Sequence, residues 1–296
     1  MSRNRSCLLV LLCCTAVNIG VLAWCDGGAA AEYRVGNGII GVLGTQAIKP
    51  DDSLIELAPK FDLGYEELVA ANPGVDPVVP DPGTKVTIPT RWLLPDLPHR
   101  QGIVVNLAEK RLYYFPPQQP ELVWTYPIGI GDEGWETPTG VYRIIEKIAN
   151  PAWHVPQSIR KQKPELPAVV PPGPDNPLGS YALRLSIGTV LIHGTNRPYG
   201  IGRKVSHGCM HLYEKDISQL FREVRTGTEV TIIRQPVKVA LVDDRVVIEV
   251  HGNPGDNLID TTYQLIVGKS LLDKVDQNKV ADAVHGMTGL PTDVSP

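Results

Sequence analysis

The side chains of this chain that could carry out chemistry gather in two short stretches, residues 192–195 and 206–211. Together they hold three of the seven histidines and Cys209, the only cysteine beyond residue 25. A thiol attacks a carbonyl carbon only as a thiolate. Because the pKa of a free cysteine is about 8.5, activation needs a nearby base or donors that favour the anion. The two stretches therefore predict a cysteine nucleophile with a histidine base.

His193 and His207 are the candidate bases. If residues 190–193 form a strand, His193 lies at its end, where a side chain can face a cleft. His207 stands two residues before Cys209, so in an extended segment the two side chains point to the same side. Gly208 lets the backbone approach a ligand closely. The N–H groups of Gly208 and Cys209 are then expected to face a developing oxyanion, an effect worth ~2.7–4 kcal/mol per donor.

Two other interpretations of these residues remain open. His207, Cys209 and His211 alternate along the chain, and His193 could complete a four-ligand zinc site. Against this, the spacings differ from the usual pairs of zinc ligands. Alternatively, Cys209 is a buried bystander among surface histidines, which the neighbouring glycines and polar residues disfavour.

The N-terminal 31 residues have the pattern of a secretory signal peptide. Arg3 and Arg5 precede a short apolar run, and the small residues at 29–31 predict cleavage after Ala31. A retained membrane anchor and a lipid-modified Cys25 are alternatives, although Trp24 is unfavourable for the latter. Cleavage would leave Cys209 as the single cysteine of the mature chain. Exported proteins use most cysteines in pairs, so a single one indicates a reactive thiol, an intermolecular bridge or a bystander.

Composition narrows the class of protein. The net charge is −4 and there is no basic stripe, which argues against nucleic acid as a partner. The 28 glycines and 27 prolines favour short strands and many turns. The apolar share of 43% is ordinary for a packed core.

A small first unit is expected over residues 33–90. Ser53 with Glu56 three residues later predicts a helix start, and a second helix over 64–71 stops at Asn72-Pro73-Gly74. A short strand at 83–89 closes the unit. Three prolines from 89 to 99 predict a stiff linker over 91–99.

A mostly β domain is expected over residues 100–234, and a helix with apolar spacing over 213–224 follows the cysteine. A segment with eight prolines, 151–177, interrupts this domain and is interpreted as a substrate-side loop in which Trp153 and His154 offer a contact surface. Beyond it, a small β appendage is expected over 235–268, with a hairpin around Asp243-Asp244. A tail over 269–296 follows, with a weak helical pattern and a mobile end. Strands in the domain are expected at 103–107, 111–115, 122–128, 141–145, 182–185, 190–192 and 230–233.

The runs His193-Gly194-Thr195-Asn196 and Ser206-His207-Gly208-Cys209-Met210 resemble the signature of the L,D-transpeptidases, whose catalytic domain is of the YkuD type. Residues 103–107, 129–131 and 137–140 and the proline-rich segment are also similar to that family, so the resemblance covers about 100–234. The unit at 33–90 resembles a LysM module, a glycan-binding unit of cell-wall proteins. The matching residues are 52–54, 57–58, 68, 71–73 and 83–89.

The resemblance implies a fold and a set of roles. The fold is a mainly β catalytic domain, a YkuD-like β-sandwich with a short helix after the cysteine motif, preceded by a small α+β LysM-like module. Cys209 is the nucleophile and His193 is the general base. The other roles implied are orientation or oxyanion binding for Gly194, Ser206, His207 and Gly208, and substrate binding for Trp153 and His211. Gly194 acts through its carbonyl on the imidazole.

The implied activity is attack on the bond between diaminopimelate and D-Ala in a peptidoglycan tetrapeptide, in the periplasm and with no cofactor or metal. The acyl group forms a thioester and passes to an amine, either of a second diaminopimelate, giving a 3→3 crosslink, or of a lysine in an outer-membrane lipoprotein. Partners are therefore peptidoglycan stem peptides and glycan. An L,D-carboxypeptidase and a glycan-binding protein with an inactive catalytic unit remain alternatives.

One position departs from the family pattern. Members commonly carry Arg or Asn where this chain has His211. Arginine is always charged and binds carboxylates through two hydrogen bonds, and histidine does neither. If this position holds a substrate carboxylate, binding is expected to be weaker or pH-dependent.

Overall fold

The structure is a computed structural model that describes residues 32–252 and 256–296. The signal-peptide, anchor and lipid-modification hypotheses concern residues 1–31 and lie outside the described residues. A nine-stranded sheet forms the centre, in the order β1-β8-β7-β6-β17-β10-β13-β14-β16. Its strands are β1 (Glu32–Arg34), β6 (Gly102–Asn106), β7 (Arg111–Phe115), β8 (Leu122–Pro127), β10 (Gly140–Ala149), β13 (Tyr181–Leu185), β14 (Leu191–His193), β16 (Met210–His211) and β17 (Glu229–Ile233).

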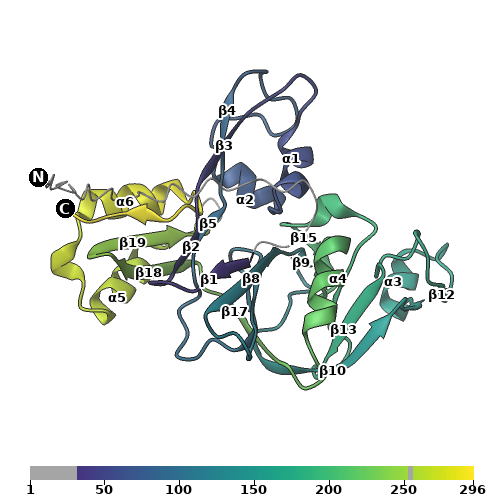
Figure 1. Ribbon diagram of the computed structural model, residues 1–296. Helices are drawn as coiled ribbons and strands as arrows, with labels where there is room; N and C mark the ends of the chain where they lie inside the picture. The colour runs from purple at the N-terminus through teal and green to yellow at the C-terminus, as the bar shows by residue number, and fades with distance from the viewer. Residues whose placement is uncertain (1–31, 253–255) are drawn as a thin grey trace, which may run out of the picture.

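Strand β10 connects two halves of this sheet. Its first residues pair with β17 and its later residues with β13, and the register shifts between Ile144 and Glu146. Apolar side chains of both halves and of α4 (Glu214–Glu223) form one core, including Ile103, Leu112, Leu183, Ile192, Ile217 and Leu220. Helix α4 lies next to β13 of the sheet (Figure 1). Ile217 and Leu220 lie three residues apart, so both face the core from the same side of this helix.

The N-terminal module has the two expected helices and the closing strand, with a further strand before them. It contains β3 (Gly44–Ala47), α1 (Leu54–Lys60), α2 (Tyr65–Ala70) and β4 (Lys85–Ile88), with β3 and β4 antiparallel. The predicted cap is present, because Ser53 Oγ accepts the N–H of Glu56 at 3.2 Å. The Asn72 side chain accepts the N–H of Thr87 at 2.6 Å and donates to Leu68 O, which joins the end of α2 to β4.

The expected linker over 91–99 is not a free connection. Residues Arg91–Leu93 form β5, which pairs with β2 (Ile39–Gly41), and Trp92, Leu93 and Leu94 are buried. Apolar side chains of the module share one core with the outer face of the central sheet, among them Leu54, Leu68, Val104, Tyr113 and Val123. The prolines indicated stiffness, but the buried residues between them attach the segment to the protein.

The C-terminal region also differs from expectation. The predicted hairpin is present as β18 (Val237–Val242) and β19 (Arg245–Val250), with positive φ at Asp243 and Asp244. The weak helical pattern of the tail corresponds to a helix, whereas the division at 268 and the mobile end are not observed. The chain continues through α5 (Ile259–Gly268), η2 (Leu272–Lys274) and α6 (Gln277–Gly286) to β20 (Thr292–Asp293), which pairs with β19. Val280 and Val284 of α6 lie one helical turn apart and enter the same core as Ile248.

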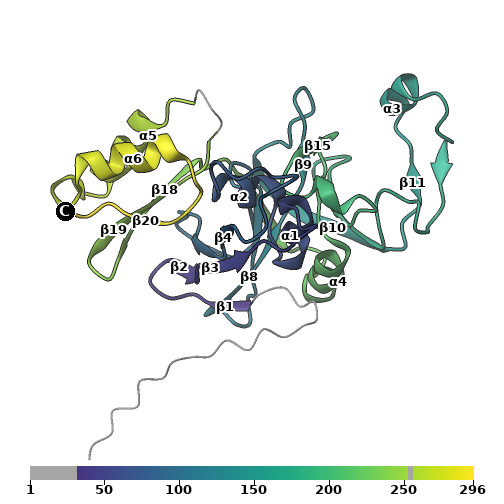
Figure 2. The same ribbon diagram turned by 90° about the horizontal axis from the view of Figure 1, so that it is seen from above.

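The proline-rich segment forms an arm that projects from the central sheet (Figure 2). It contains β11 (Trp153–His154), α3 (Gln157–Gln162) and β12 (Val169–Val170), which pairs with β11. The Asn176 side chain closes its base by donating to Pro151 O at 2.8 Å. The remaining elements are η1 (Pro198–Gly200) and a parallel pair, β9 (Ile130–Gly131) with β15 (Lys204–Ser206). Among the described residues, no helix is both long and apolar enough to span a membrane.

Candidate active site

The parallel pair β14–β16 positions the predicted nucleophile and base. In its register Ile192 is opposite Met210 and His193 is opposite His211. Residues two apart on a strand point to one side. Cys209 and His211 therefore share a face with His193, and Cys209 lies diagonally across from the imidazole.

The Cys209 thiol is half-buried in an apolar wall formed by Leu178, Ala182 and Leu191. Trp153, at the base of the arm, packs against the same wall. Burial raises the pKa of Cys209, which a backbone hydrogen bond from Leu191 only partly offsets. The thiol is therefore protonated at neutral pH, and its sulfur lies 3.8 Å from Thr189 O rather than against the imidazole. Catalytic hydrogen bonds often tighten only when substrate binds.

His193 is 3% exposed, and its Nδ1 lies 2.6 Å from the carbonyl oxygen of Gly194. A carbonyl only accepts, so Nδ1 carries the proton and Nε2 is the basic nitrogen of the neutral ring. Burial lowers the pKa of His193 to about 4, and the hydrogen bonds that the ring makes to the backbone of Gly194 and Leu178 oppose this only in part. At neutral pH the imidazole is therefore uncharged and able to accept a proton.

The turn before the nucleophile is held by Ser206. This buried hydroxyl donates to Cys209 O at 2.6 Å and accepts the N–H of Gly208 at 3.1 Å. Gly208 has a φ of +97°, a conformation that favours glycine. Because its N–H is bonded within the turn, the expectation that it faces an oxyanion is not met in this structure. The N–H of Cys209 stays a candidate donor.

A second turn clamps the nucleophile loop from outside. Thr137 Oγ1 donates to Gly208 O at 3.1 Å and accepts the N–H of Gly131 at 3.0 Å. Next to it, the ring of Trp135 lies 4.9 Å from the ring of His207, centre to centre. Both rings are exposed, so they form a surface beside the nucleophile. The sequence singled out His207 but not Trp135, because nothing local indicates that the two turns meet.

The four residues of the zinc hypothesis are not gathered. The His207 ring contacts Trp135 at the surface, whereas the half-buried His211 ring lies 4.5 Å from His193. Burial, and then the neighbouring His193, lower the pKa of His211 well below its usual value. Among the described residues, the one group of three side chains with metal-ligating atoms close together is Glu109, Glu249 and His251, at another place in the fold.

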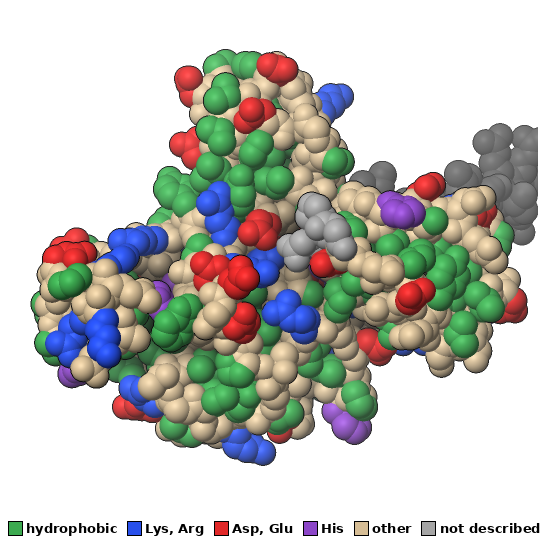
Figure 3. Space-filling view, turned by 180° about the vertical axis from the view of Figure 1, so that it is seen from behind, with side chains coloured by type: hydrophobic (Ala, Val, Ile, Leu, Met, Phe, Trp, Pro, Cys, Tyr) green, Lys and Arg blue, Asp and Glu red, His purple; other side chains and the backbone are tan. Residues whose placement is uncertain are grey.

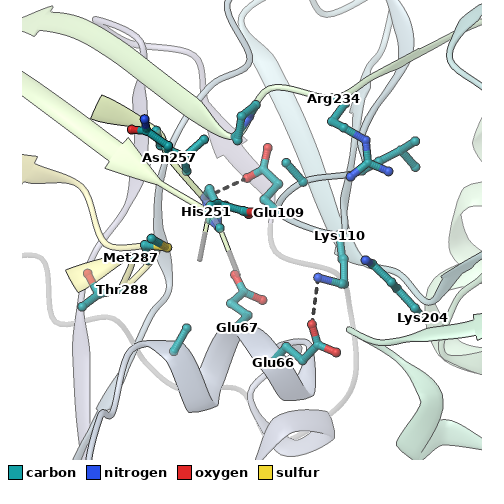
Figure 4. A pocket seen from close by; sticks show the side chains of 18 residues that line it. Glu66, Glu67, Glu109, Lys110, Lys204, Arg234, His251, Asn257, Met287 and Thr288 are labelled. Atoms are coloured by element: carbon teal, nitrogen blue, oxygen red, sulfur yellow. Dashed lines mark ion pairs between the residues drawn. The ribbon is translucent and has the colours of Figure 1, made fainter. Parts of the chain in front are cut away.

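Two members of that group, Glu109 and His251, border a cavity of about 410 Å³, where the N-terminal module, the central sheet and the C-terminal hairpin with its helices meet (Figure 4). Acidic and basic side chains gather on this side of the molecule (Figure 3). Behind the cavity, the ammonium of Lys238 lies 2.8 Å from Glu109 and 2.5 Å from Glu249. Glu109, Glu249, His251 and Lys238 are called the junction cluster below. The Lys238 ammonium already supplies a cation to its carboxylates. No described residue of 192–195 or 206–211 lines the cavity, so it is separate from the thiol.

Comparisons with known proteins identify both the catalytic domain and the N-terminal module. Residues 100–232 match the model of the L,D-transpeptidase catalytic domain, and residues 47–89 match the LysM domain. The probable L,D-transpeptidase YcfS of Escherichia coli is 45% identical over 241 residues, which cover 78% of this chain and 74% of the relative. This chain belongs to the L,D-transpeptidase family.

A further relative covers more of the chain. The probable L,D-transpeptidase YbiS of Escherichia coli is 36% identical over 300 residues, which cover 93% of this chain and 96% of the relative. Among solved structures, the NMR structure of the catalytic domain from an Enterococcus faecium L,D-transpeptidase is 21% identical with a TM-score of 0.36, covering 45% of this chain and 97% of that one. The predicted fold class, a mainly β catalytic domain behind a LysM module, is confirmed.

One residue near the site was not singled out from the sequence for a role in it. Glu214, the first residue of α4, accepts the N–H groups of Thr195 and Ser180. In the sequence Glu214 is recognisable only as an acidic residue at a helix start, where the helix dipole favours a negative charge. Its contact with Ser180 joins positions 34 apart in the chain.

Proposed function

We propose that this L,D-transpeptidase cleaves the bond between diaminopimelate and D-Ala in a peptidoglycan tetrapeptide and transfers the acyl group to an amine through a thioester on Cys209. The observation that carries the proposal is the shared face of the β14–β16 pair. It presents a half-buried thiol and a buried, neutral imidazole on adjacent strands.

In the first half-reaction, His193 Nε2 takes the thiol proton and the sulfur attacks the carbonyl carbon. The negative oxygen of the tetrahedral intermediate is stabilised by backbone N–H groups of the nucleophile turn, among which that of Cys209 is the candidate. The C–N bond then breaks, the amine of D-Ala takes the proton from the imidazolium, and an acyl thioester remains. In the second half-reaction an incoming amine gives its proton to His193, attacks the thioester carbonyl and releases the Cys209 thiol.

The pKa directions suit this sequence of steps. Burial keeps His193 unprotonated well below neutral pH, so a base is always available, and it keeps Cys209 protonated until the base acts. The ion pair of thiolate and imidazolium therefore forms only along the reaction. Such a resting state limits unproductive reactions of the thiol, because the thiolate is the reactive form.

His211 gives this enzyme a different substrate contact from a member with arginine. Because burial lowers its pKa well below the usual value, His211 is neutral at neutral pH and offers a carboxylate a hydrogen bond without a charge. We expect His211→Arg to lower KM at neutral pH and to leave kcat within a few-fold. An unchanged KM would separate His211 from substrate binding.

The LysM module and the location belong to the same proposal. The module is expected to hold the glycan while Cys209 acts on its stem peptide, with Trp153 at the base of the arm contacting that peptide. Residues 1–31 are proposed to be a signal peptide that directs the enzyme to the periplasm. The acceptor amine is a second diaminopimelate or a lysine of an outer-membrane lipoprotein.

The test is intact-protein mass spectrometry of the purified mature enzyme with a disaccharide tetrapeptide that contains diaminopimelate. The reaction is run with and without a second peptide amine, and with Cys209→Ala as control. Loss of D-Ala, a Cys209 thioester and then a crosslinked dimer support transpeptidation. Tripeptide alone would favour the carboxypeptidase, and no reaction together with protein-bound zinc would favour the metal hypothesis.

A carbapenem offers a second, substrate-independent test. The family resemblance predicts that its strained β-lactam carbonyl acylates Cys209, which adds the mass of the drug to the protein. The absence of any adduct on Cys209 would count against the proposed nucleophile.

A further inference from the structure

We propose that Glu214 is a positioning residue of the transpeptidation reaction, which acts on His193 through the peptide group between Gly194 and Thr195. The proposal rests on the role of His193 as the general base. No contact between Glu214 and the substrate is required.

The two hydrogen bonds that carry the proposal share one peptide group. Glu214 Oε1 accepts the N–H of Thr195 at 2.7 Å, and the Gly194 carbonyl of that same peptide accepts His193 Nδ1 at 2.6 Å. Hydrogen bonds in a chain polarise one another, so a carboxylate on the N–H side makes the carbonyl a stronger acceptor. A stronger acceptor stabilises the imidazolium that forms when Cys209 gives up its proton.

The second carboxylate oxygen holds another segment that contacts the imidazole. Glu214 Oε2 accepts the N–H of Ser180 at 3.0 Å. Ser180 stands two residues after Leu178, whose backbone also hydrogen bonds with the His193 ring. One side chain therefore anchors both backbone segments that hold the imidazole.

The local sequence leaves room for this carboxylate. Gly179 and Gly194 both face Glu214, and a Cβ atom on either glycine would overlap Oε1. The start of α4 adds electrostatic support, because a helix N-terminus favours a negative charge. Buried Ile217 and Leu220 hold the helix against the sheet. The carboxylate is thus fixed by the packing of the domain.

The arrangement differs from a cysteine or serine triad in one respect. In such a triad the carboxylate bonds the imidazole N–H directly, and its removal costs about 10⁴ in kcat. Here the Gly194–Thr195 peptide stands between the carboxylate and the ring. The effect of Glu214 should therefore be smaller, in the range of roughly 10- to 100-fold that is typical of groups that orient a functional side chain from behind.

The experiment compares Glu214→Gln with Glu223→Gln in the full mature enzyme. Glutamine keeps the shape of Glu214 but loses the charge and can accept only one of the two N–H groups. Glu223 is an exposed residue on the same helix and serves as the matched control. We expect kcat to fall about 10- to 100-fold in Glu214→Gln, with little change in KM, and to stay unchanged in Glu223→Gln.

The pH profile of Cys209 alkylation by iodoacetamide separates a positioning role from a merely structural one. If Glu214 stabilises the imidazolium, the profile of Glu214→Gln shifts to lower rates at neutral pH, where alkylation needs the thiolate–imidazolium pair, and is unchanged at high pH, where the thiolate forms beside a neutral imidazole. Gly194→Ala, which keeps the charge but displaces the carboxylate, should produce a shift in the same direction. A lower Tm with an unchanged profile in both variants would overturn the proposal.

Alkylation needs no substrate, so the two proposals fail separately. If the wild-type enzyme forms no crosslink but the alkylation profile still shifts in Glu214→Gln, the proposed function is wrong and the role of Glu214 is kept. An enzyme that forms crosslinks with the same kcat in Glu214→Gln contradicts only that role.

Discussion

Two clusters of buried ionisable groups in this protein differ in charge. The groups at the junction cluster are charged, whereas the pair at the active site is neutral. At the junction cluster, burial alone would lower the pKa of Lys238, but the charges of Glu109 and Glu249 raise it. Glu249 shows the reverse, since burial is outweighed by Lys238 and His251, which lower its pKa. At the active site burial is the largest influence, because the charge of Arg184 and the backbone hydrogen bonds oppose it only in part. Burial therefore raises the pKa of Cys209 and lowers that of His193.

The difference lies in the partners and not in the depth of burial. Lys238 and Glu249 are as buried as His193, yet both are held in their charged forms by ion pairs of 2.5–2.8 Å. Buried groups of opposite charge hold separate segments of the fold together. Here Glu109 belongs to the β6–β7 turn, while Lys238 and Glu249 belong to the C-terminal hairpin. A buried pair left neutral is instead able to exchange a proton, which is what catalysis requires.

The largest expected effect is on activity. Cys209→Ala should abolish turnover, a loss of at least about 10³-fold, because no other thiol is present among the described residues. Since the group removed is small, neutral and half-buried, unfolding free energy should change by less than about 1 kcal/mol. Crosslinking assays and urea denaturation check the two parts. Residual turnover would mean that another residue is the nucleophile.

The junction should behave in the opposite way. Lys238→Met removes the buried ammonium between two carboxylates, leaving only His251 beside them, and should lower the free energy of unfolding by about 3–5 kcal/mol. At low temperature, where the variant is folded, its kcat should be unchanged. Arg245→Met is the matched control, because Arg245 pairs with Asp293 on the surface of the same sheet and should cost about 0–1 kcal/mol. If urea denaturation gives equal losses of unfolding free energy in the two variants, the buried cluster is no more important for stability than the surface pair.

The two clusters are expected to lose their contributions to stability in different pH ranges. The pKa of His193 is lowered from its usual 6.5 to about 4, so its contribution to stability is fully present above pH 6.5 and is lost as pH falls toward 4. Between pH 7 and 4.5 this amounts to about 2–3 kcal/mol. The lowered pKa of Glu249 acts only below 4.5.

Urea midpoints across this range test the assignment. In His193→Asn the loss between pH 7 and 4.5 should shrink, while the exposed-arm control His154→Asn should retain it. A full loss in His193→Asn would assign the acid sensitivity to another group, of which His211 is the nearest.

The smallest effect is expected at the surface of the active site. Trp135→Ala removes the ring that faces His207 and should raise KM by about 2- to 10-fold, the equivalent of ~0.5–1.5 kcal/mol for one aromatic contact. The exposed Tyr199→Ala is the control. Steady-state kinetics with the tetrapeptide check this, and an unchanged KM would limit the Trp135–His207 pair to a structural contact.

Local patterns were sufficient for most elements of the catalytic domain. The hairpin of β6 and β7, the helix α4 and the Ser53 cap follow from apolar spacing and capping residues that stand within a few positions of one another. The motif around Cys209 is equally local, which is why the family was recognisable. The arm at 151–177 was identified as a loop beside the site, but its strand pair and the closing role of Asn176 were not visible in its sequence.

The sequence by itself determined which residues are capable of chemistry and which family they belong to, because both are written in short runs of residues. Tertiary structure decided what surrounds them. Lys238 meets Glu109 across 129 positions and Leu93 meets Glu249 across 156, so the linker and the C-terminal hairpin became parts of packed units. Glu214 likewise reaches His193 through a peptide group that only folding brings to it. Such contacts leave no periodic trace in the sequence, because they depend on which surfaces are buried together and not on the order of neighbouring residues.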